Sequence, residues 1–135
     1  MTNPNELNIK EEIYRENILD HFKNPHNFGE LAPCSFYHCE VNQLCGDEVK
    51  LFVKLDDKET VAAARFNGHG CAISVASASM LTDYIIGKSI GELKCIQSSE
   101  IIELLGVKLS VVRMKCGLLV LKTLRNGIKT MEVRQ

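Results

Sequence analysis

The chain has 135 residues, 45% of them hydrophobic and 24% charged, which is typical of one soluble globular domain with its own core. With 16 basic and 17 acidic residues its net charge is −1, so composition gives no indication of a nucleic-acid or anionic-membrane partner. No apolar run approaches the roughly 20 residues that span a bilayer, and the polar first ten residues lack the apolar stretch of a signal peptide. We therefore expect a cytoplasmic protein whose six cysteines are thiols, metal ligands or catalysts and not a disulfide framework.

Residues 1–10 are predicted to form a flexible leader, and residues 11–135 a single domain. Apolar residues recur at helical spacing over Glu11–Phe22, which predicts a helix. Asn24-Pro25 should end it, because a residue before proline avoids the helical region. Three strand-like runs follow, at Ser35–Val41, Asp47–Leu55 and Thr60–Asn67. The polar turn between the last two predicts an antiparallel hairpin.

Beyond Cys71 the pattern changes from strands to helices. The predicted helices are Ala72–Ile86, Ser89–Leu93, Ser98–Leu105 and Cys116–Arg125. Ser89 and Ser98 are expected to be N-caps, and Asn126-Gly127 should end the last helix. Strands followed by helices predict an α+β fold: a small three-stranded antiparallel sheet with about five helices packed mainly on one face.

Three cysteines occupy positions where a metal-binding or reactive thiol is more expected than a buried core cysteine. Cys45 lies in a polar turn, two positions before Asp47. If the backbone is extended there, both side chains leave on one side, and a thiolate and a carboxylate can share a metal. Cys71 and Cys116 each open a predicted helix, where unpaired amides and the helix dipole favour the thiolate.

The remaining candidates are weaker. Cys34, Cys39 and Cys95 are interpreted as core or incidental surface cysteines. No CxxC pair occurs, so a zinc ribbon is not expected. His69, two residues before Cys71, is a ligand, a proton donor or, preferably, a solvated turn residue. The basic residues between Lys108 and Arg134 form either a docking face for an acidic partner or, preferably, a solvated helix face.

Four segments resemble one known family along nearly the whole chain, from about Tyr14 to Ile128. They are YRENILDHFKNPHNFG (14–29), NQLCGD (42–47), GHGCAIS with ASAS (68–74 and 76–79) and RMKC (113–116). In these motifs the chain resembles the IscU/SufU/NifU N-terminal family of iron–sulfur cluster assembly proteins, except that Gln43 replaces the family's proline.

The resemblance implies a metal site made of Cys45, Asp47, Cys71 and Cys116. That site would hold a zinc ion, iron or a labile 2Fe-2S cluster. The implied partners are a cysteine desulfurase of the IscS or SufS type, which supplies persulfide sulfur, and recipient apo-proteins or carriers. The chain is expected to be a monomer or weak dimer, and a scaffold or sulfur acceptor more than a conventional enzyme.

The two branches of the family differ around the third cysteine. Scaffold members usually have histidine where this chain has Lys115, and Lys115 and Arg113 fit the SufU type. Yet Ile101–Val112 is too short for the usual SufU insertion, and LSVVR (109–113) lacks the prolines of the scaffold type. The resemblance implies Cys45 as sulfur acceptor in a SufU-like protein and Cys116 in a scaffold.

Three readings therefore stay open: a cluster scaffold, a zinc-dependent sulfur acceptor in a relay, and a structural zinc domain. We favour Cys45 as acceptor slightly, because Lys115 replaces the histidine. Lys115 is either an electrostatic aid to the Cys116 thiolate or a solvated lysine. An aspartate ligand and the lack of CxxC pairs argue against the structural zinc domain.

Overall fold

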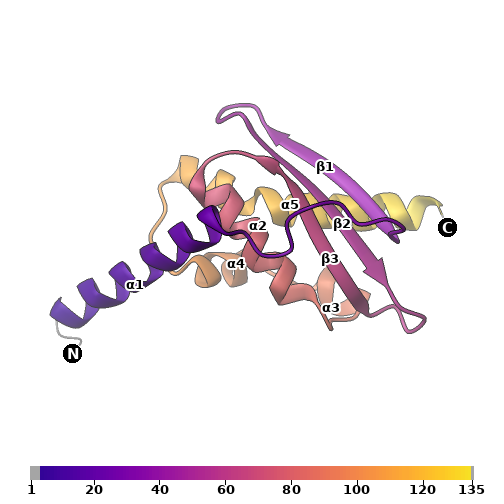
Figure 1. The fold of residues 1–135 in the computed structure, drawn as a ribbon, viewed down its shortest axis with the longest axis horizontal. Coiled ribbons are helices and arrows are strands. Elements are labelled where there is room, and N and C mark those ends of the chain that lie inside the picture. Colours follow the sequence, from indigo (N-terminus) through magenta and orange to yellow (C-terminus); the bar gives the residue numbers. More distant parts are fainter. Residues whose placement is uncertain (1–3, 135) are drawn as a thin grey trace.

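The computed structural model describes residues 4–134 and has an α+β fold with one three-stranded antiparallel sheet and five helices (Figure 1). The elements are α1 (Pro4–Lys23), β1 (Phe36–Asn42), β2 (Asp47–Leu55), β3 (Val61–His69), α2 (Ala72–Ile85), α3 (Ile90–Lys94), α4 (Ser98–Leu105) and α5 (Val111–Arg134). The predicted fold class is confirmed, and each predicted strand is present within two residues of its expected ends.

The strands lie in the order β1-β2-β3. Alternation along β2 places Val49, Leu51 and Val53 in the core, as the period of two in a strand requires. In the register of the two hairpins, Asn42 faces Asp47 and Glu48 faces His69. The first hairpin turn therefore joins β1 to β2 beside the end of β3.

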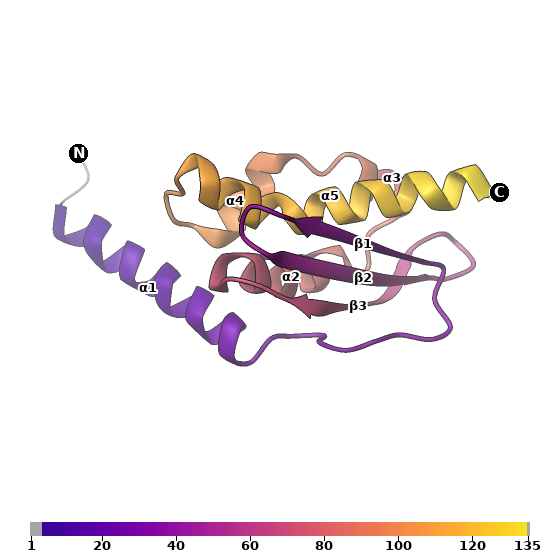
Figure 2. The same ribbon diagram turned by 90° about the horizontal axis from the view of Figure 1, so that it is seen from above.

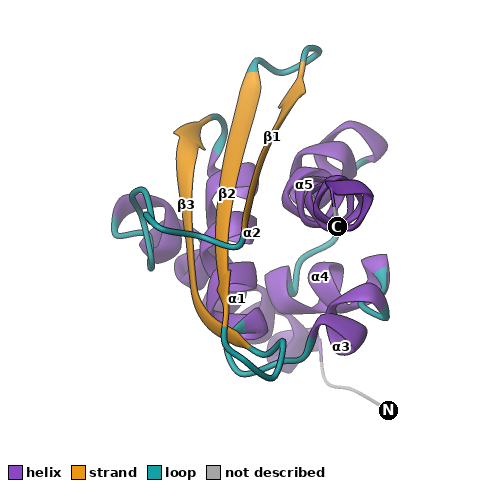
Figure 3. Ribbon diagram, turned by 90° about the vertical axis from the view of Figure 1, so that its right-hand side faces the viewer, coloured by secondary structure: helices purple, strands orange, loops and turns teal. Residues whose placement is uncertain are grey.

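Helices cover the inner face of the sheet (Figure 3). Helix α5 packs along β1 and β2, α2 packs on β3, and α4 packs against both helices. Small side chains let α2 lie deep in the molecule, and all but one of the residues from Ser74 to Thr82 are buried. The largest fully buried side chains between these layers are Leu51, Phe66, Leu81, Ile85, Leu93, Ile101, Leu105, Leu121 and Leu124.

Helix α1 starts earlier than predicted, at Pro4, and ends at Lys23 as expected. It packs mainly against α2 and runs away from the body of the molecule (Figure 2). Because of this position only Ile18 of the predicted apolar stripe is buried, whereas Ile13 and Leu19 are exposed. Residues 4–10 of the predicted leader form the start of α1, and residues 1–3 lie outside the described part of the chain. The flexibility of the leader stays a prediction.

Helix α5 differs most from the prediction, because it begins at Val111 and continues to Arg134. Ser110 caps its start: its Oγ accepts a hydrogen bond from the Arg113 N–H at 3.3 Å. Asn126-Gly127 does not end the helix, since Gly127 is buried where α5 lies against Phe36 of β1. Gly127, which suggested the end of the helix, is instead a point where α5 lies close to β1.

The two short helices were each predicted to have a serine N-cap, and the structure confirms one of the two. Ser89 caps α3 together with Glu92, as predicted. Helix α4 is capped by Gln97 with Glu100, not by Ser98. Within residues 4–134, none of the helices combines the length and the hydropathy of a membrane span.

Candidate metal centre

Three cysteines and one aspartate from three parts of the chain meet at one end of the sheet, where the β1–β2 turn, the β3–α2 connection and the start of α5 come together (Figure 1). One ligand atom from each of Cys45, Asp47 and Cys116 lies within 4.8 Å of the other two. Cys71 Sγ is 3.8 Å from Asp47 Oδ2. The fold thus brings together all four residues that the family resemblance implies as ligands.

Asp47 is the innermost member, with no exposed surface. Its Oδ1 accepts a hydrogen bond from the Cys71 N–H at 2.9 Å, which ties the start of β2 to the start of α2. Gly70 has a φ of +158°, and a Cβ there would overlap Asp47 Oδ1 and Ser74 Oγ. The glycine before the second cysteine therefore makes room for the carboxylate.

Cys71 is the N-cap residue of α2, as predicted. Ser74, in the first turn, donates from Oγ to the Cys71 carbonyl at 3.0 Å and lies 3.9 Å from its Sγ. Ser74 is buried, so it supports the cysteine from inside. Sequence reasoning did not identify this serine as part of the site.

Cys116 does not lie at a helix start, so the prediction that it opens the last helix is wrong. It lies in the second turn of α5 and is 1% exposed. Burial raises the pKa of its thiol, and the neighbouring Asp47, Cys45 and Cys71 raise that pKa further. The helix-dipole argument for a Cys116 thiolate is therefore wrong, because Cys116 lies inside the helix, where burial and hydrogen bonds with Asp47, Cys45 and Cys71 favour the neutral thiol.

Cys45 is exposed at the tip of the β1–β2 turn. The backbone there is a turn and not extended, with Gly46 at a φ of +70°. Asn42 organises this turn: its carbonyl accepts from the Cys45 and Gly46 N–H groups at 3.3 and 2.9 Å, and its Oδ1 accepts from the Leu44 N–H. The turn, not strand alternation, sets Cys45 beside Asp47.

Asn42 also donates from Nδ2 to Cys116 Sγ at 3.9 Å. One side chain therefore connects the turn of Cys45 to the sulfur of Cys116. Sequence reasoning assigned Asn42 no role of its own, although it is the first residue of the NQLCGD motif.

The two basic residues proposed for the site, Arg113 and Lys115, lie at its solvent-exposed edge. Arg113 and Lys115 are both exposed in the first turns of α5. Lys115 lines a groove with Leu44 and Met114, whereas Arg113 lines a separate hollow next to α1. Among the described residues, no hydrogen bond or ion pair joins either to the cysteines, so their roles stay predictions.

Similarities to known proteins agree with this site. Residues 13–135 match the family described as the NifU-like N terminal domain. The chain is similar to the zinc-dependent sulfurtransferase SufU of Bacillus subtilis strain 168, with 37% identity over 133 residues, 86% of this chain and 89% of the relative. It is also similar to the iron–sulfur cluster assembly scaffold protein IscU of Escherichia coli K12, with 34% identity over 114 residues, 78% of this chain and 84% of the relative.

A crystal structure of SufU from Fervidobacterium islandicum AW-1 has the same fold, with a TM-score of 0.73 and 32% identity over 87% of this chain and 98% of that one. The chain is similar to both an IscU and a SufU, so these similarities do not assign it to one of the two branches of the family. The mixed motifs around Lys115 predict this result. The chain therefore belongs to the NifU-like N-terminal domain family of iron–sulfur cluster assembly proteins.

Proposed function

We propose that this protein receives persulfide sulfur from a cysteine desulfurase and binds iron or a labile 2Fe-2S cluster for transfer to apo-proteins. Cys45, Asp47, Cys71 and Cys116 are the proposed ligands. The observation that supports this most is the convergence of the four side chains, with Cys45 and Cys116 sulfurs 3.4 Å apart and Cys45 open to solvent.

The donor set fits a cargo of iron or zinc. Thiolates are the soft ligands that these metals prefer, and four donors suit a tetrahedral site. Asp47 and Cys116 are both buried, and among residues 4–134 no lysine or arginine forms an ion pair with Asp47. A bound cation would supply the missing positive charge, and a carboxylate ligand releases iron more readily than a fourth thiolate.

Cys45 is the better placed sulfur acceptor. Its thiolate would attack the outer sulfur of the desulfurase persulfide, so that a new S–S bond forms on Cys45 while the desulfurase cysteine leaves as a thiolate. Cys116 is less suited to a first attack, because it is buried and its thiol pKa is raised. A persulfide on Cys45 would lie beside Cys116 and Asp47, where the metal is expected.

A second candidate function is a zinc-dependent sulfur relay. It is favoured by the 37% identity to the B. subtilis sulfurtransferase and by Lys115 in place of the scaffold histidine. The same four residues would hold zinc, and Cys45 would leave the metal to accept sulfur. The acceptor role of Cys45 is thus common to both candidates.

Anaerobic reconstitution with a cysteine desulfurase, cysteine and ferrous iron distinguishes the cluster scaffold from the zinc-dependent sulfur relay. A visible sulfur-to-iron charge-transfer spectrum that is lost in Cys71→Ser and kept in Cys95→Ser supports the scaffold. Tightly held zinc, no chromophore, and a desulfurase accelerated without iron support the relay. Tightly held zinc with neither chromophore nor acceleration would leave only a structural zinc domain.

A further inference from the structure

Asn42 is the last residue of β1 and lies opposite Asp47, the first residue of β2. Residues directly opposite each other in an antiparallel pair put their side chains on the same face of the sheet. Asp47 shares the inner face of β2 with Val49 and Leu51. The Asn42 side chain therefore points toward α5, and its Nδ2 reaches Cys116 Sγ at 3.9 Å.

A hydrogen bond within the turn fixes which way the Asn42 amide points. Its Oδ1 accepts from the Leu44 N–H at 3.2 Å, and only the oxygen of an amide can accept there. The NH₂ group therefore faces the Cys116 sulfur. The other close neighbours of that sulfur are acidic groups, namely the Cys45 thiol, 3.4 Å away, and the Asp47 carboxyl group. Asn42 thus gives the buried sulfur a neutral N–H donor.

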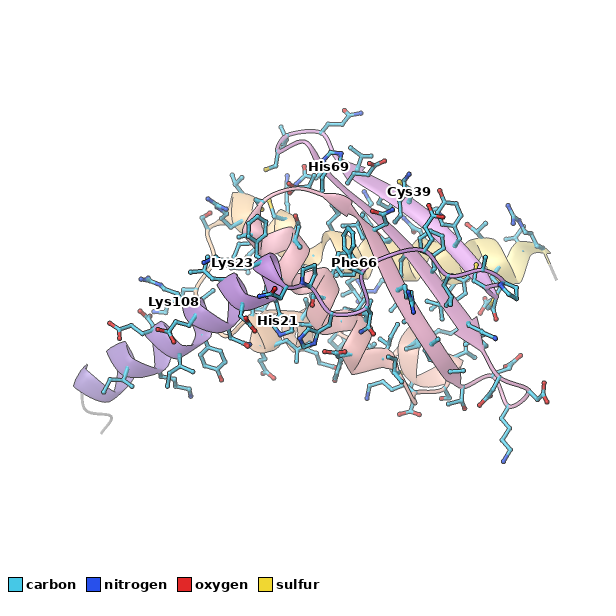
Figure 4. All side chains as sticks on the ribbon, in the orientation of Figure 1. His21, Lys23, Cys39, Phe66, His69 and Lys108 are labelled. Carbon is cyan, nitrogen blue, oxygen red and sulfur yellow. The ribbon has the colours of Figure 1, made fainter. Side chains whose placement is uncertain are left out.

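The turn that carries Cys45 projects beyond the third strand. In the register of the sheet, the last residue of β3, His69, lies opposite Glu48, and Figure 4 shows the β1–β2 turn extending past His69. Within the turn, the Asn42 carbonyl accepts from the Cys45 and Gly46 N–H groups. One residue therefore fixes the exposed sulfur with its backbone and contacts the buried sulfur with its side chain.

We propose that Asn42 is a positioning residue for the passage of sulfur from Cys45 to Cys116, a role that rests on the proposed function above. The Cys116 sulfur attacks the outer sulfur of a persulfide on Cys45, so that an S–S bond forms on Cys116 and the S–S bond to Cys45 breaks. The proton that leaves the Cys116 thiol ends on the Cys45 sulfur, and the exchange consumes no oxidant or reductant. The Asn42 amide holds the attacking sulfur toward the turn and donates to the negative charge that develops on it.

Two substitutions of Asn42 separate its donor from its role in the turn. Asn42→Asp keeps an oxygen that can accept from the Leu44 N–H, because aspartate and asparagine form the same kind of turn, but it has no N–H for Cys116. Asn42→Ser is the uncharged counterpart, since serine forms this turn more weakly. Gln43→Glu is the matched control. It makes the same change from amide to carboxylate one residue later, and within residues 4–134 no hydrogen bond joins the Gln43 side chain to a cysteine.

The test follows sulfur on the full-length, metal-free chain during incubation with a cysteine desulfurase and cysteine. Alkylation and peptide mass spectrometry measure the persulfide on Cys45 and on Cys116 over time. We expect persulfide on Cys45 first and on Cys116 later, and none on Cys116 in Cys45→Ser. Slow alkylation of the buried Cys116 thiol before the reaction shows in each variant that the fold is kept.

Both Asn42 variants should accept sulfur on Cys45 at the rate of the unsubstituted protein. They should pass it to Cys116 at least about threefold more slowly, which is the effect of losing one hydrogen bond. Gln43→Glu should keep the unsubstituted ratio of the two persulfides. A purely structural role of Asn42 would instead slow both steps together.

Persulfide on Cys116 of Cys45→Ser at the unsubstituted rate would overturn the passage, because Cys116 would then accept sulfur directly. Equal ratios of the two persulfides in the Asn42 variants and in the unsubstituted protein would overturn the role of Asn42. Either result leaves the proposed function intact, since sulfur still arrives on a proposed ligand. Absence of persulfide from both cysteines of the unsubstituted protein would contradict the proposed function and the role of Asn42 together.

Discussion

Cys45 Sγ lies 3.4 Å from Cys116 Sγ, although 71 positions separate the two residues in the chain. The first belongs to an exposed turn and the second to the buried side of α5. Asn42 connects them, since it holds the turn and donates to the Cys116 sulfur. An accessible thiol is thereby placed against an inaccessible one, as the proposed passage of sulfur from the surface to the proposed metal ligands requires.

This proximity predicts a specific disulfide under mild oxidation. In the metal-free protein, diamide should link Cys45 to Cys116, because their sulfurs already touch, and peptide mapping by mass spectrometry should find that pair. Bound zinc should protect both thiols, since coordinated thiolates are less available for exchange. Cys95 is also exposed and serves as the internal control. Preferential pairing of Cys95 with either cysteine would contradict the observed geometry.

Gly70→Ala should damage the site more than its backbone conformation alone explains. A φ in this sparsely populated region costs a residue with a side chain about 1–3 kcal/mol, and a Cβ at Gly70 would in addition overlap the Asp47 carboxylate. Gly87→Ala is the matched control, because Gly87 has a φ of +90° with nothing within 4 Å of its Cβ position.

We expect both variants to unfold at lower denaturant concentration, and only Gly70→Ala to bind zinc more weakly. Competition with a chromogenic chelator measures that affinity. Equal zinc affinity in the two variants would mean that Gly70 does not position the carboxylate.

Asp47→Cys should lengthen the lifetime of a reconstituted cluster. The substitution exchanges the proposed oxygen ligand for a fourth thiolate, which binds iron more strongly. The decay of the visible charge-transfer band in the presence of an apo-ferredoxin measures the lifetime. Asp57→Cys adds a thiol in the exposed β2–β3 turn and should leave the decay unchanged. A faster decay in Asp47→Cys would exclude the carboxylate as the ligand that eases release.

The sequence predicts those parts of the fold that depend on local pattern. Alternation along Asp47–Leu55 identifies β2 and its inward face, and the GHGC segment places Cys71 at the start of α2. Both follow from neighbouring residues, because strand periodicity and the break in pattern at a helix start are local features. The four proposed metal ligands come from the family motifs, and the structure brings Cys45, Asp47 and Cys116 together with Cys71 beside Asp47.

The features that the sequence does not predict correctly depend on tertiary contacts. Cys116 lies inside α5 because Ser110 caps the helix six residues earlier, and nothing in the apolar pattern marks that serine. The turn of Cys45 depends on hydrogen bonds to Asn42. The prediction assumed an extended backbone there, and an extended backbone does not form these bonds. The contacts of Glu48 in β2 with Cys39 in β1 and with His69 in β3 depend on the register of three strands, which sequence alone leaves undetermined.

His21 should make folding stability depend on pH. It is buried, and its Nδ1 lies 2.7 Å from Ser79 Oγ, which also accepts from the His26 N–H. Burial, followed by the nearby His26, lowers the pKa of His21. The unfolded chain, where histidine has a pKa of about 6.5, therefore binds this proton more readily, so stability is complete above about pH 6.5 and falls as the pH drops below it.

Urea unfolding of the metal-free protein between pH 5.5 and pH 7.5 should show this loss. His21→Gln cannot titrate, so the slope below about pH 6.5 should flatten in that variant. An identical slope in both proteins would assign the pH dependence to other groups.

Gly127→Ala tests how closely α5 lies on the sheet. In an exposed helix interior this substitution stabilises by about 1 kcal/mol. Here a Cβ would lie 2.9 Å from Phe36 Cδ2 and 3.1 Å from His38 Cβ, and overpacking of this kind typically costs about 1–3 kcal/mol. We therefore expect a net loss in the free energy of unfolding. Gly91→Ala in α3 has its nearest neighbour at 3.8 Å and should be neutral or stabilising. A gain in stability for Gly127→Ala would show that α5 and β1 can separate, and would move Cys116 away from the turn of Cys45.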